Sequence, residues 1–125
     1  MKAISLQPPW GLIVCANLKD CENRDWRSNF TGEVYIHQSK KWDRDAMDTI
    51  MRVDRNVYIW LMNRMEMAQW YGIIGKTTFG KCTDYIQSRW FFGKFAYPCS
   101  NGFLFDKPIP YRGQLGFFEV NLNGH

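Results

Sequence analysis

The sequence has no long hydrophobic run, and this absence excludes a membrane-spanning helix. No segment approaches about 18 consecutive apolar residues, the length that a candidate transmembrane helix needs. Residues 1–6 also lack the basic region, apolar core and small-residue cleavage site of a secretory signal peptide. We therefore expect a soluble, cytoplasmic protein that does not bind membranes.

Metal-binding patterns are missing as well. The chain has four cysteines, Cys15, Cys21, Cys82 and Cys99, and two histidines, His37 and His125. No two of the cysteines form a Cys-x-x-Cys pair, which argues against a structural zinc site. We expect no metal and no other cofactor, and we interpret the thiols as core or near-surface residues in a reducing compartment. Cys21 lies between Lys19 and Arg24, where positive charge would lower the pKa of its thiol.

Charge of either sign is modest, and no part of the chain has low complexity. The formal net charge is +4, from 16 Lys and Arg against 12 Asp and Glu. This charge permits binding to nucleic acid without requiring it. The 125 residues fit a single domain, residues 1–125, with one core. Aromatic residues make up 17%, which suits a compact fold with much strand.

Proline and asparagine delimit the first helix. Residues 3–6 have a strand pattern, which Pro8 and Pro9 end. Pro9 suits the first position of a helix because its missing amide hydrogen would be unpaired there anyway. We predict about two helical turns over residues 10–16, ended by Asn17 in the left-handed conformation. Lys19 then follows the helix C-terminus, where it could be only a capping charge.

The rest of the chain alternates between strand and helix patterns. Strand patterns cover residues 31–37, 70–79 with a continuation toward 84–85, 102–105 and 115–120, and residues 106–113 are turn-rich. Apolar spacings of three and four over residues 43–68, with Asp43 as N-cap, predict two helices broken near residues 54–56. The predicted fold class is α+β. We expect a small, partly open β-barrel of five to six mostly antiparallel strands, with one short helix after the first strand and two helices in the middle.

The segment after the first helix concentrates charge. Residues 19–26 include Lys19, Glu22, Arg24 and Trp26. If residues 20–26 are extended, alternation directs Glu22, Arg24 and Trp26 to one face. A buried strand would have apolar residues at these positions, so this face is either solvated or binds a ligand.

Several blocks of the sequence resemble those of the ASCH family, the activating-signal-cointegrator homology domains. The blocks are Met1-Lys2-Ala3-Ile4-Ser5-Leu6 with Pro9-Trp10, Lys19-x-x-Glu22-Asn23-Arg24-x-Trp26, Gly32-x-Val34-Tyr35-Ile36-His37-x-Ser39-Lys40, and residues 72–75 and 106–120. They follow in the expected order and cover nearly the whole chain. The signature of the family is Gly-x-Lys-x-x-Glu-x-Arg, and Asn17 replaces its glycine. Asparagine is the next-best residue for a left-handed backbone, so the turn should survive. Pro8 and Thr31 are two further departures, and Thr31 removes a phosphate contact.

This resemblance implies a PUA-like barrel with a cleft that relatives use for nucleic acids or nucleotides. In that cleft Lys19 and Arg24 would neutralise phosphate, and Trp10 or Trp26 would stack on an unpaired base. The expected partner is RNA, another single-stranded nucleic acid or a modified nucleotide. Lys19→Ala or Arg24→Ala should then weaken binding with little loss of thermal stability. Trp10 could instead be a core residue.

Three further residues have supporting roles in this interpretation. Glu22 would accept a hydrogen bond from a base amino group or hold the neighbouring cations in place. Ser39 and Lys40, at the end of the adjoining strand, would extend the basic rim. Glu22 and Arg24 could also form only a surface ion pair, worth under about 1 kcal/mol.

Other classes of function stay open. One branch of the family resembles amidohydrolases that act on acetylated cytidine, and another is linked to metal-dependent RNA cleavage. In an enzyme, Lys19 and Glu22 would be the catalytic pair. The amidohydrolase branch uses a separate glutamate, and between the predicted helices and the next strand Glu66 is the only candidate for it. The aromatic run of residues 90–95 could bind a protein partner or single-stranded nucleic acid, or close the barrel.

Overall fold

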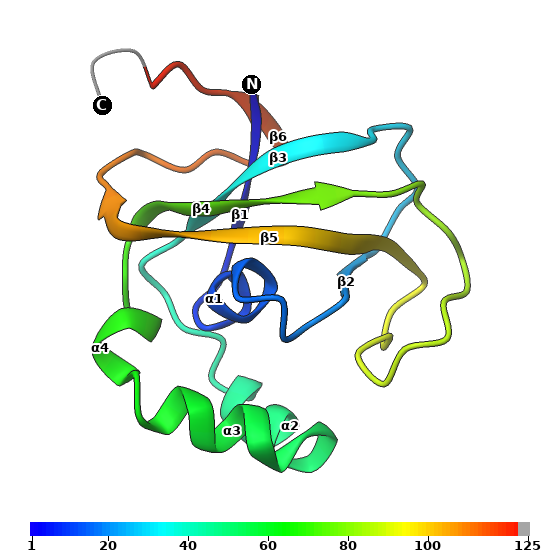
Figure 1. Ribbon diagram of the computed structural model, residues 1–125. Coiled ribbons are helices and arrows are strands. Elements are labelled where there is room, and N and C mark those ends of the chain that lie inside the picture. Colours follow the sequence, from blue (N-terminus) through cyan, green and yellow to red (C-terminus); the bar gives the residue numbers. More distant parts are fainter. Residues whose placement is uncertain (123–125) are drawn as a thin grey trace.

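Residues 1–122, the part of the chain that the computed structural model describes, form a curled sheet with helices beyond one end of it (Figure 1). The six strands of this part are β1 (Lys2–Leu6), β2 (Cys21–Arg24), β3 (Gly32–Gln38), β4 (Gly72–Phe79), β5 (Phe95–Ile109) and β6 (Phe117–Glu119). Its helices are α1 (Trp10–Cys15), α2 (Ala46–Val53), α3 (Arg55–Met62) and α4 (Met65–Ala68). The predicted α+β class is confirmed.

The strands form one mixed sheet in the order β2-β5-β4-β3-β1-β6. β1 pairs with β3 in parallel, and the other neighbouring strands pair antiparallel. This mixed sheet corrects the prediction of a mostly antiparallel barrel. The parallel pair follows from the path of the chain, because the crossover through α1 and β2 enters β3 in the direction of β1.

Aromatic rings show that the sheet curls into a half-barrel. Phe79 of β4 and Tyr97 of β5 stack with their ring centroids 4.5 Å apart, and Phe117 of β6 meets both rings edge-on. β6 and β5 are far apart in the order of the sheet. Their side chains can therefore meet only because the sheet bends around a common core, much of which is aromatic.

Helix α1 packs against the middle of this sheet. It lies against β3, β4 and β5, and its side chains Ile13 and Val14 are buried. Gln38 ties the helix to the chain before β4: its Oε1 accepts from the Leu12 amide (3.0 Å), and its Nε2 donates to the Trp70 carbonyl (3.0 Å). The Leu12 amide has no partner within the first turn of the helix. Gln38 therefore satisfies a buried donor that would otherwise be costly.

The middle of the chain forms the helices that lie together at one end of the molecule (Figure 1). The predicted break is present, because Asp54 separates α2 from α3 and accepts two backbone hydrogen bonds from the first turn of α3. The N-cap of α2 is Asp45 rather than Asp43. Asp43 instead accepts a hydrogen bond from the Trp10 indole (2.9 Å). A second break after α3 makes α4 a separate helix, so this region holds three helices where two were predicted.

Strand β5 is longer than the sequence predicts. The pattern predicts a strand over residues 102–105 followed by turns, whereas β5 runs from Phe95 to Ile109. Asn101 has a left-handed backbone (φ 53°) within it, and its pairing with β4 shifts register in two places. Bulges of this kind put turn-type residues inside a continuous strand. The alternation of the sequence is lost there although strand pairing continues.

Candidate functional site

The turn after α1 positions the predicted site residues. Asn17 has the left-handed backbone expected of it (φ 63°). Its side chain also joins this turn to β5, because Oδ1 accepts from the Gly102 amide (2.7 Å) and Nδ2 donates to the Gly102 carbonyl (3.0 Å). Glycine would permit the turn but could not make these two hydrogen bonds. Asn17, in place of the glycine of the ASCH signature, therefore ties the turn to β5.

Lys19 is buried, with 3% of its surface exposed. Its Nζ donates to the carbonyl of Cys21 (2.7 Å) and to Oε1 of Glu22 (3.2 Å). The same Nζ lies 5.1 Å from the centroid of the Trp10 ring. These contacts replace the water that an ammonium group would otherwise need. Lys19 is therefore a fixed part of the interior and not a capping charge in solvent.

Glu22 lies between two cations. Its Oε1 contacts Lys19, and its Oε2 lies 3.9 Å from Nη1 of Arg24. The Glu22 side chain is 10% exposed and that of Arg24 is 20% exposed. The pair is thus not an exposed surface ion pair, and this face of β2 is not solvated. A carboxylate buried to this extent needs such partners because desolvating a charge is costly.

A pocket lies beside these three residues, and we call it the Lys19 pocket. Its volume is about 410 Å³, within the range of pockets for small ligands. Trp10, Lys19, Glu22, Arg24, Asp43 and Phe92 are among the residues that line it. Two of its charged side chains are cations and two are carboxylates, so the formal charge of the lining is balanced.

Asn23 holds one wall of the Lys19 pocket, a role that sequence reasoning missed. Its Nδ2 donates to the Trp90 carbonyl (2.9 Å), and its Oδ1 accepts from the amides of Phe92 (2.9 Å) and Gly93 (3.2 Å). Trp90 is buried, whereas Phe92 is 52% exposed. The aromatic run is therefore divided: Trp90 closes the core and Phe92 lines the pocket. No sequence motif marks this link, because Asn23 and the run are about 70 residues apart.

A smaller pocket adjoins the first, and we call it the Trp26 pocket. Its volume is about 180 Å³, and it is lined by Asn23, Arg24, Asp25, Trp26 and Gly93. Asn23, Arg24 and Gly93 line both pockets. The Trp26 ring is 62% exposed, and its centroid lies 5.8 Å from Cζ of Arg24. Trp26 therefore lies beside the Lys19 pocket rather than within it.

Ser39 and Lys40 do not line either pocket. Lys40 places its Nζ 5.0 Å from the centroid of the Tyr71 ring. The hydroxyl of Ser39 is buried without a hydrogen-bond partner among the described residues, and its amide donates to the Leu6 carbonyl. The predicted basic rim is thus not assembled by the structure. Lys19, Glu22 and Arg24 are brought together, with Trp26 next to them.

Burial raises the pKa of the Cys21 thiol, and this effect outweighs the opposite effect of the Lys19 charge. Burial also raises the pKa of Cys99. The Lys19 charge thus lowers the pKa of Cys21, as the sequence suggests, but burial has the larger effect and the pKa is raised overall. Both thiols are protonated at neutral pH, so neither offers a nucleophile to the site.

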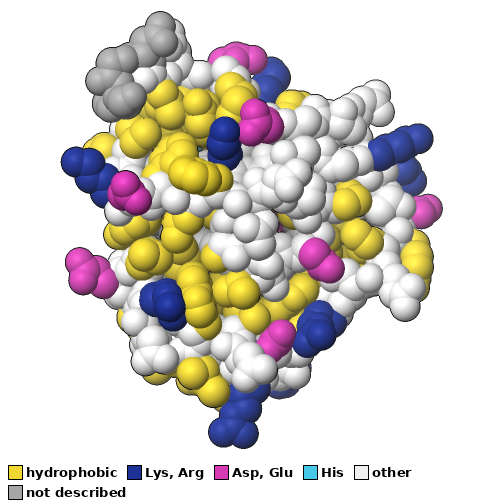
Figure 2. Space-filling model, viewed as in Figure 1, with side chains coloured by type: hydrophobic (Ala, Val, Ile, Leu, Met, Phe, Trp, Pro, Cys, Tyr) yellow, Lys and Arg dark blue, Asp and Glu magenta, His cyan; other side chains and the backbone are white. Residues whose placement is uncertain are grey.

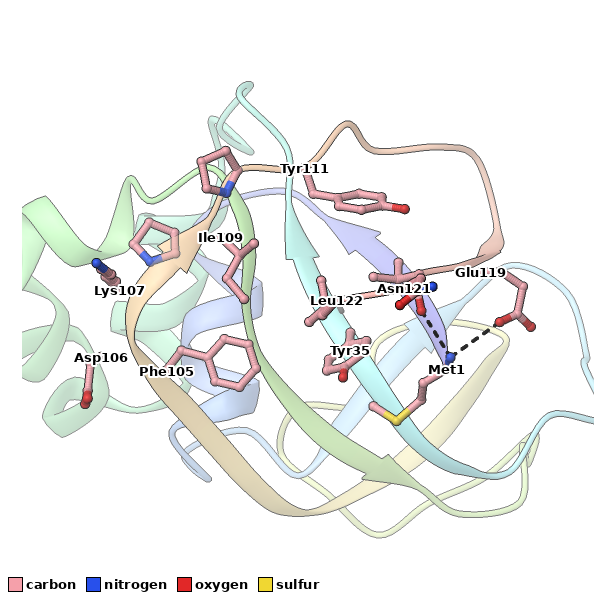
Figure 3. A pocket seen from close by; sticks show the side chains of 13 residues that line it. Met1, Tyr35, Phe105, Asp106, Lys107, Ile109, Tyr111, Glu119, Asn121 and Leu122 are labelled. Atoms are coloured by element: carbon pink, nitrogen blue, oxygen red, sulfur yellow. Dashed lines mark hydrogen bonds and ion pairs between the residues drawn. The ribbon is translucent and has the colours of Figure 1, made fainter. Parts of the chain in front are cut away.

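A larger groove lies elsewhere on the molecule, and we call it the Tyr111 groove. Its volume is about 1300 Å³. Figure 3 shows Tyr35, Phe105, Ile109 and Leu122 grouped in it, while Asp106 and Lys107 point away from them. The amino group of Met1 donates to the Val120 carbonyl (3.2 Å) and pairs with Oε2 of Glu119 (3.5 Å). On the face of the molecule in Figure 2, hydrophobic side chains gather on the side that carries the end of β5. Apolar side chains and charged groups both line the groove, and the charged groups of Met1 and Glu119 already pair with each other.

Within residues 1–122, no three His, Cys, Asp or Glu side chains come together as a set of metal ligands. His125 lies outside the described residues. None of the helices described has the length and apolar character required to cross a membrane.

No family model matches this sequence, and no curated protein matches it. The resemblance to the ASCH family stays a prediction. The site is therefore interpreted from its own geometry.

Proposed function

We propose that this chain is a PUA-like domain of the ASCH type that binds RNA or another single-stranded nucleic acid in the Lys19 pocket. The observation that carries this proposal is the buried contact of Lys19 with Glu22, next to a half-buried Arg24 at the wall of a pocket. Buried charges that border a pocket are typical of binding sites, since the fold gains little from burying them.

Each charged group has a distinct role in this proposal. Arg24 approaches Glu22 only to 3.9 Å, so its guanidinium keeps donors for a phosphate. Glu22 accepts a hydrogen bond from a base amino group. Lys19 holds Glu22 in place by a 3.2 Å contact. Phe92 offers an exposed ring against which a base can lie.

The balanced charge of the pocket predicts how binding depends on salt. Two cations and two carboxylates line it, and only Arg24 is positioned to contact a phosphate. On the face in Figure 2, Lys and Arg side chains are scattered among Asp and Glu rather than gathered. Binding should therefore involve about one phosphate contact and weaken only modestly with salt. The logarithm of the association constant should fall with the logarithm of the salt concentration with a slope of about −1.

The enzymatic alternatives fit the geometry less well. Glu66 lies exposed on α4 and does not line the Lys19 pocket, so the second glutamate of an amidohydrolase is missing there. The Lys19 amine already donates to the Cys21 carbonyl and to Glu22, so it would have to give up these contacts to act as a base. A metal-dependent ribonuclease would need carboxylates of the pocket to bind its metal ion. Glu22 is already engaged with Lys19, and Asp43 with Trp10.

Fluorescence anisotropy with short labelled RNA and DNA oligonucleotides tests the proposal. Arg24→Gln should weaken binding about tenfold, because a charge-assisted contact to phosphate is lost. Arg52→Gln is the matched control, since Arg52 is exposed on α2 and lines neither pocket. Absence of binding to any oligonucleotide, or equal effects of the two substitutions, would contradict the proposal.

A further inference from the structure

The Lys19 pocket and the Trp26 pocket are two chambers of one groove. They share Asn23, Arg24 and Gly93, so Arg24 lies at the junction between the two pockets. Gly93 has no side chain to narrow this passage, and Asn23 holds its amide (3.2 Å). A ligand that fills the first pocket can therefore continue into the second.

We propose that this groove takes two successive nucleotides of a single strand. One base enters the Lys19 pocket, the next base stacks on Trp26, and the phosphate that links them contacts Arg24. This assignment rests on the proposed function and adds the length of the ligand to it. The Trp26 pocket is then a second base subsite.

The exposure of Trp26 supports this subsite. An indole that is 62% exposed contributes little to the core, and large exposed aromatic rings serve to stack bases in single-strand sites. The neighbouring guanidinium of Arg24 lies 5.8 Å from the ring centroid, which brings a cation to the same place as the stacking surface.

Position and charge limit the linker to a single phosphate. Arg24 is the only cation that lines both pockets, and Asp25 is the charged residue found in the Trp26 pocket alone. The carboxylate of Asp25 repels a second phosphate placed beyond Trp26.

The sizes of the pockets agree with this order. The Lys19 pocket, at about 410 Å³, is more than twice the size of the Trp26 pocket, at about 180 Å³. The first has room for a whole base, and the second, which is smaller, offers the face of the Trp26 ring. The first base would be recognised by Glu22, and the second would be bound with little sequence preference.

Calorimetric titration with two matched ligands tests the inference. A nucleoside methyl phosphodiester and the dinucleoside monophosphate of the same base each carry one singly charged phosphodiester, so the second nucleoside is the main difference between them. We expect the dinucleotide to bind about tenfold more tightly, as the stacking of one base on an aromatic ring provides. Lengthening to four nucleotides should add less than about threefold at 0.15 M salt.

Substitution of Trp26 should remove the advantage of the second base. In Trp26→Ala, the ratio of dinucleotide to mononucleotide affinity should fall from about ten to about one. Phe103→Ala is the matched control, because Phe103 is also an exposed aromatic residue (57%) and lines neither pocket. It should leave the ratio unchanged.

The results separate this inference from the proposed function. Binding of the mononucleotide without any gain for the dinucleotide would overturn the two-nucleotide groove and leave nucleic-acid binding in place. A gain that survives in Trp26→Ala, or one that grows equally with every added nucleotide, would also overturn it. Absence of binding to all these ligands would overturn both.

Discussion

Lys19 and Glu22 are charged residues that the fold keeps away from water, at 3% and 8% exposure. Taking each charge out of water costs several kcal/mol, and apolar side chains of similar size would often stabilise a fold as well or better. Stability alone therefore does not explain the pair. In the proposed function, the pair holds a carboxylate beside the pocket, so that the acceptor is in place before the ligand arrives.

Breaking this pair should be costly. We expect Glu22→Gln to lower the free energy of unfolding by about 3 kcal/mol, because Lys19 would remain charged and unpaired in the interior. Urea denaturation followed by far-UV circular dichroism measures the loss. The burial of Lys19 also corrects the expectation that Lys19→Ala would leave thermal stability nearly unchanged.

An exposed ion pair of the same chain provides the control for this substitution. Lys76 and Glu33 approach to 3.1 Å, and their side chains are 37% and 54% exposed. Glu33→Gln should change the free energy of unfolding by less than about 1 kcal/mol. Similar small losses for Glu22→Gln and Glu33→Gln would show that the buried pair does not stabilise the fold.

His37 is another buried polar residue, and its hydrogen bonds define its tautomer. Its Nε2 faces the Tyr111 carbonyl (2.6 Å), which can only accept, so Nε2 carries the hydrogen. Nδ1 then accepts from the Ser5 hydroxyl (2.8 Å). Burial lowers the pKa of His37, and the hydrogen bond to Tyr111 partly offsets this effect. The neutral imidazole therefore joins β1 and β3 to the segment after β5.

Stability should decrease in mild acid because of His37. Its pKa is lower in the folded state than in the unfolded chain, so the unfolded chain binds the proton more readily. The contribution is present above the unfolded pKa of about 6.5 and is lost as the pH falls below it. Urea denaturation between pH 5 and 8 should show this decline, and His37→Gln should make it shallower. A control variant, His125→Gln, should retain it; equal curves for both variants would contradict the assignment to His37.

At the scale of elements, helix ends depend on particular side chains. Asp54 and Asp45 both occupy N-cap positions, but only Asp54 accepts hydrogen bonds from the first turn of its helix. Spacing predicts the break between α2 and α3, yet it does not identify which aspartate caps the first of them. That depends on tertiary contact as well, because Asp43 accepts from the Trp10 indole through Oδ2 while its Oδ1 accepts from the Asp45 amide before the helix.

The two N-cap residues should therefore contribute differently to the free energy of unfolding. We expect Asp54→Ala to lower the free energy of unfolding by about 1 kcal/mol, because two amides of α3 lose their acceptor. Asp54→Asn should retain most of the cap. Asp45→Ala is the matched control and should have an effect under about 0.5 kcal/mol. Thermal denaturation measures all three, and equal losses at Asp54 and Asp45 would contradict the capping role.

At the scale of the whole molecule, one core connects nearly every element. Its buried members include Ile4 of β1, Leu12 of α1, Ile50 of α2, Leu61 of α3 and Tyr97 of β5. A main cluster that spans so many elements favours one cooperative unit, and a smaller cluster of Ala3, Ile73, Phe118 and Val120 lies on or next to the same strands. The prediction that residues 1–125 are a single domain can therefore be tested by unfolding the protein.

Unfolding in urea should show a single transition. Tryptophan fluorescence and far-UV circular dichroism should report the same midpoint, because every tryptophan except the exposed Trp26 lies in or against the main core that the regular elements share. The tryptophans are distributed along the chain, at Trp10, Trp26, Trp42, Trp60, Trp70 and Trp90. Two separated midpoints, with the helices unfolding before the sheet, would contradict a single cooperative domain.

Local chemistry explains which predictions succeed. Pro9 and Asn17 delimit α1 because each restricts or permits backbone angles by itself, and the alternation of residues 32–38 defines β3 for the same kind of reason. The order of Lys19, Glu22 and Arg24 places them around one strand. These properties depend on neighbours in the sequence, and the sequence by itself determines them.

Tertiary structure decides what depends on distant residues. The sheet curls into a half-barrel, which brings Phe117 to Phe79. Strand β5 continues through its bulges because β4 pairs with it. Asn23 reaches the Phe92 amide across 69 positions and forms a wall of the Lys19 pocket. Burial turns the Lys19 charge into a fixed structural contact, because desolvation depends on everything that surrounds a side chain and not on its neighbours in the chain.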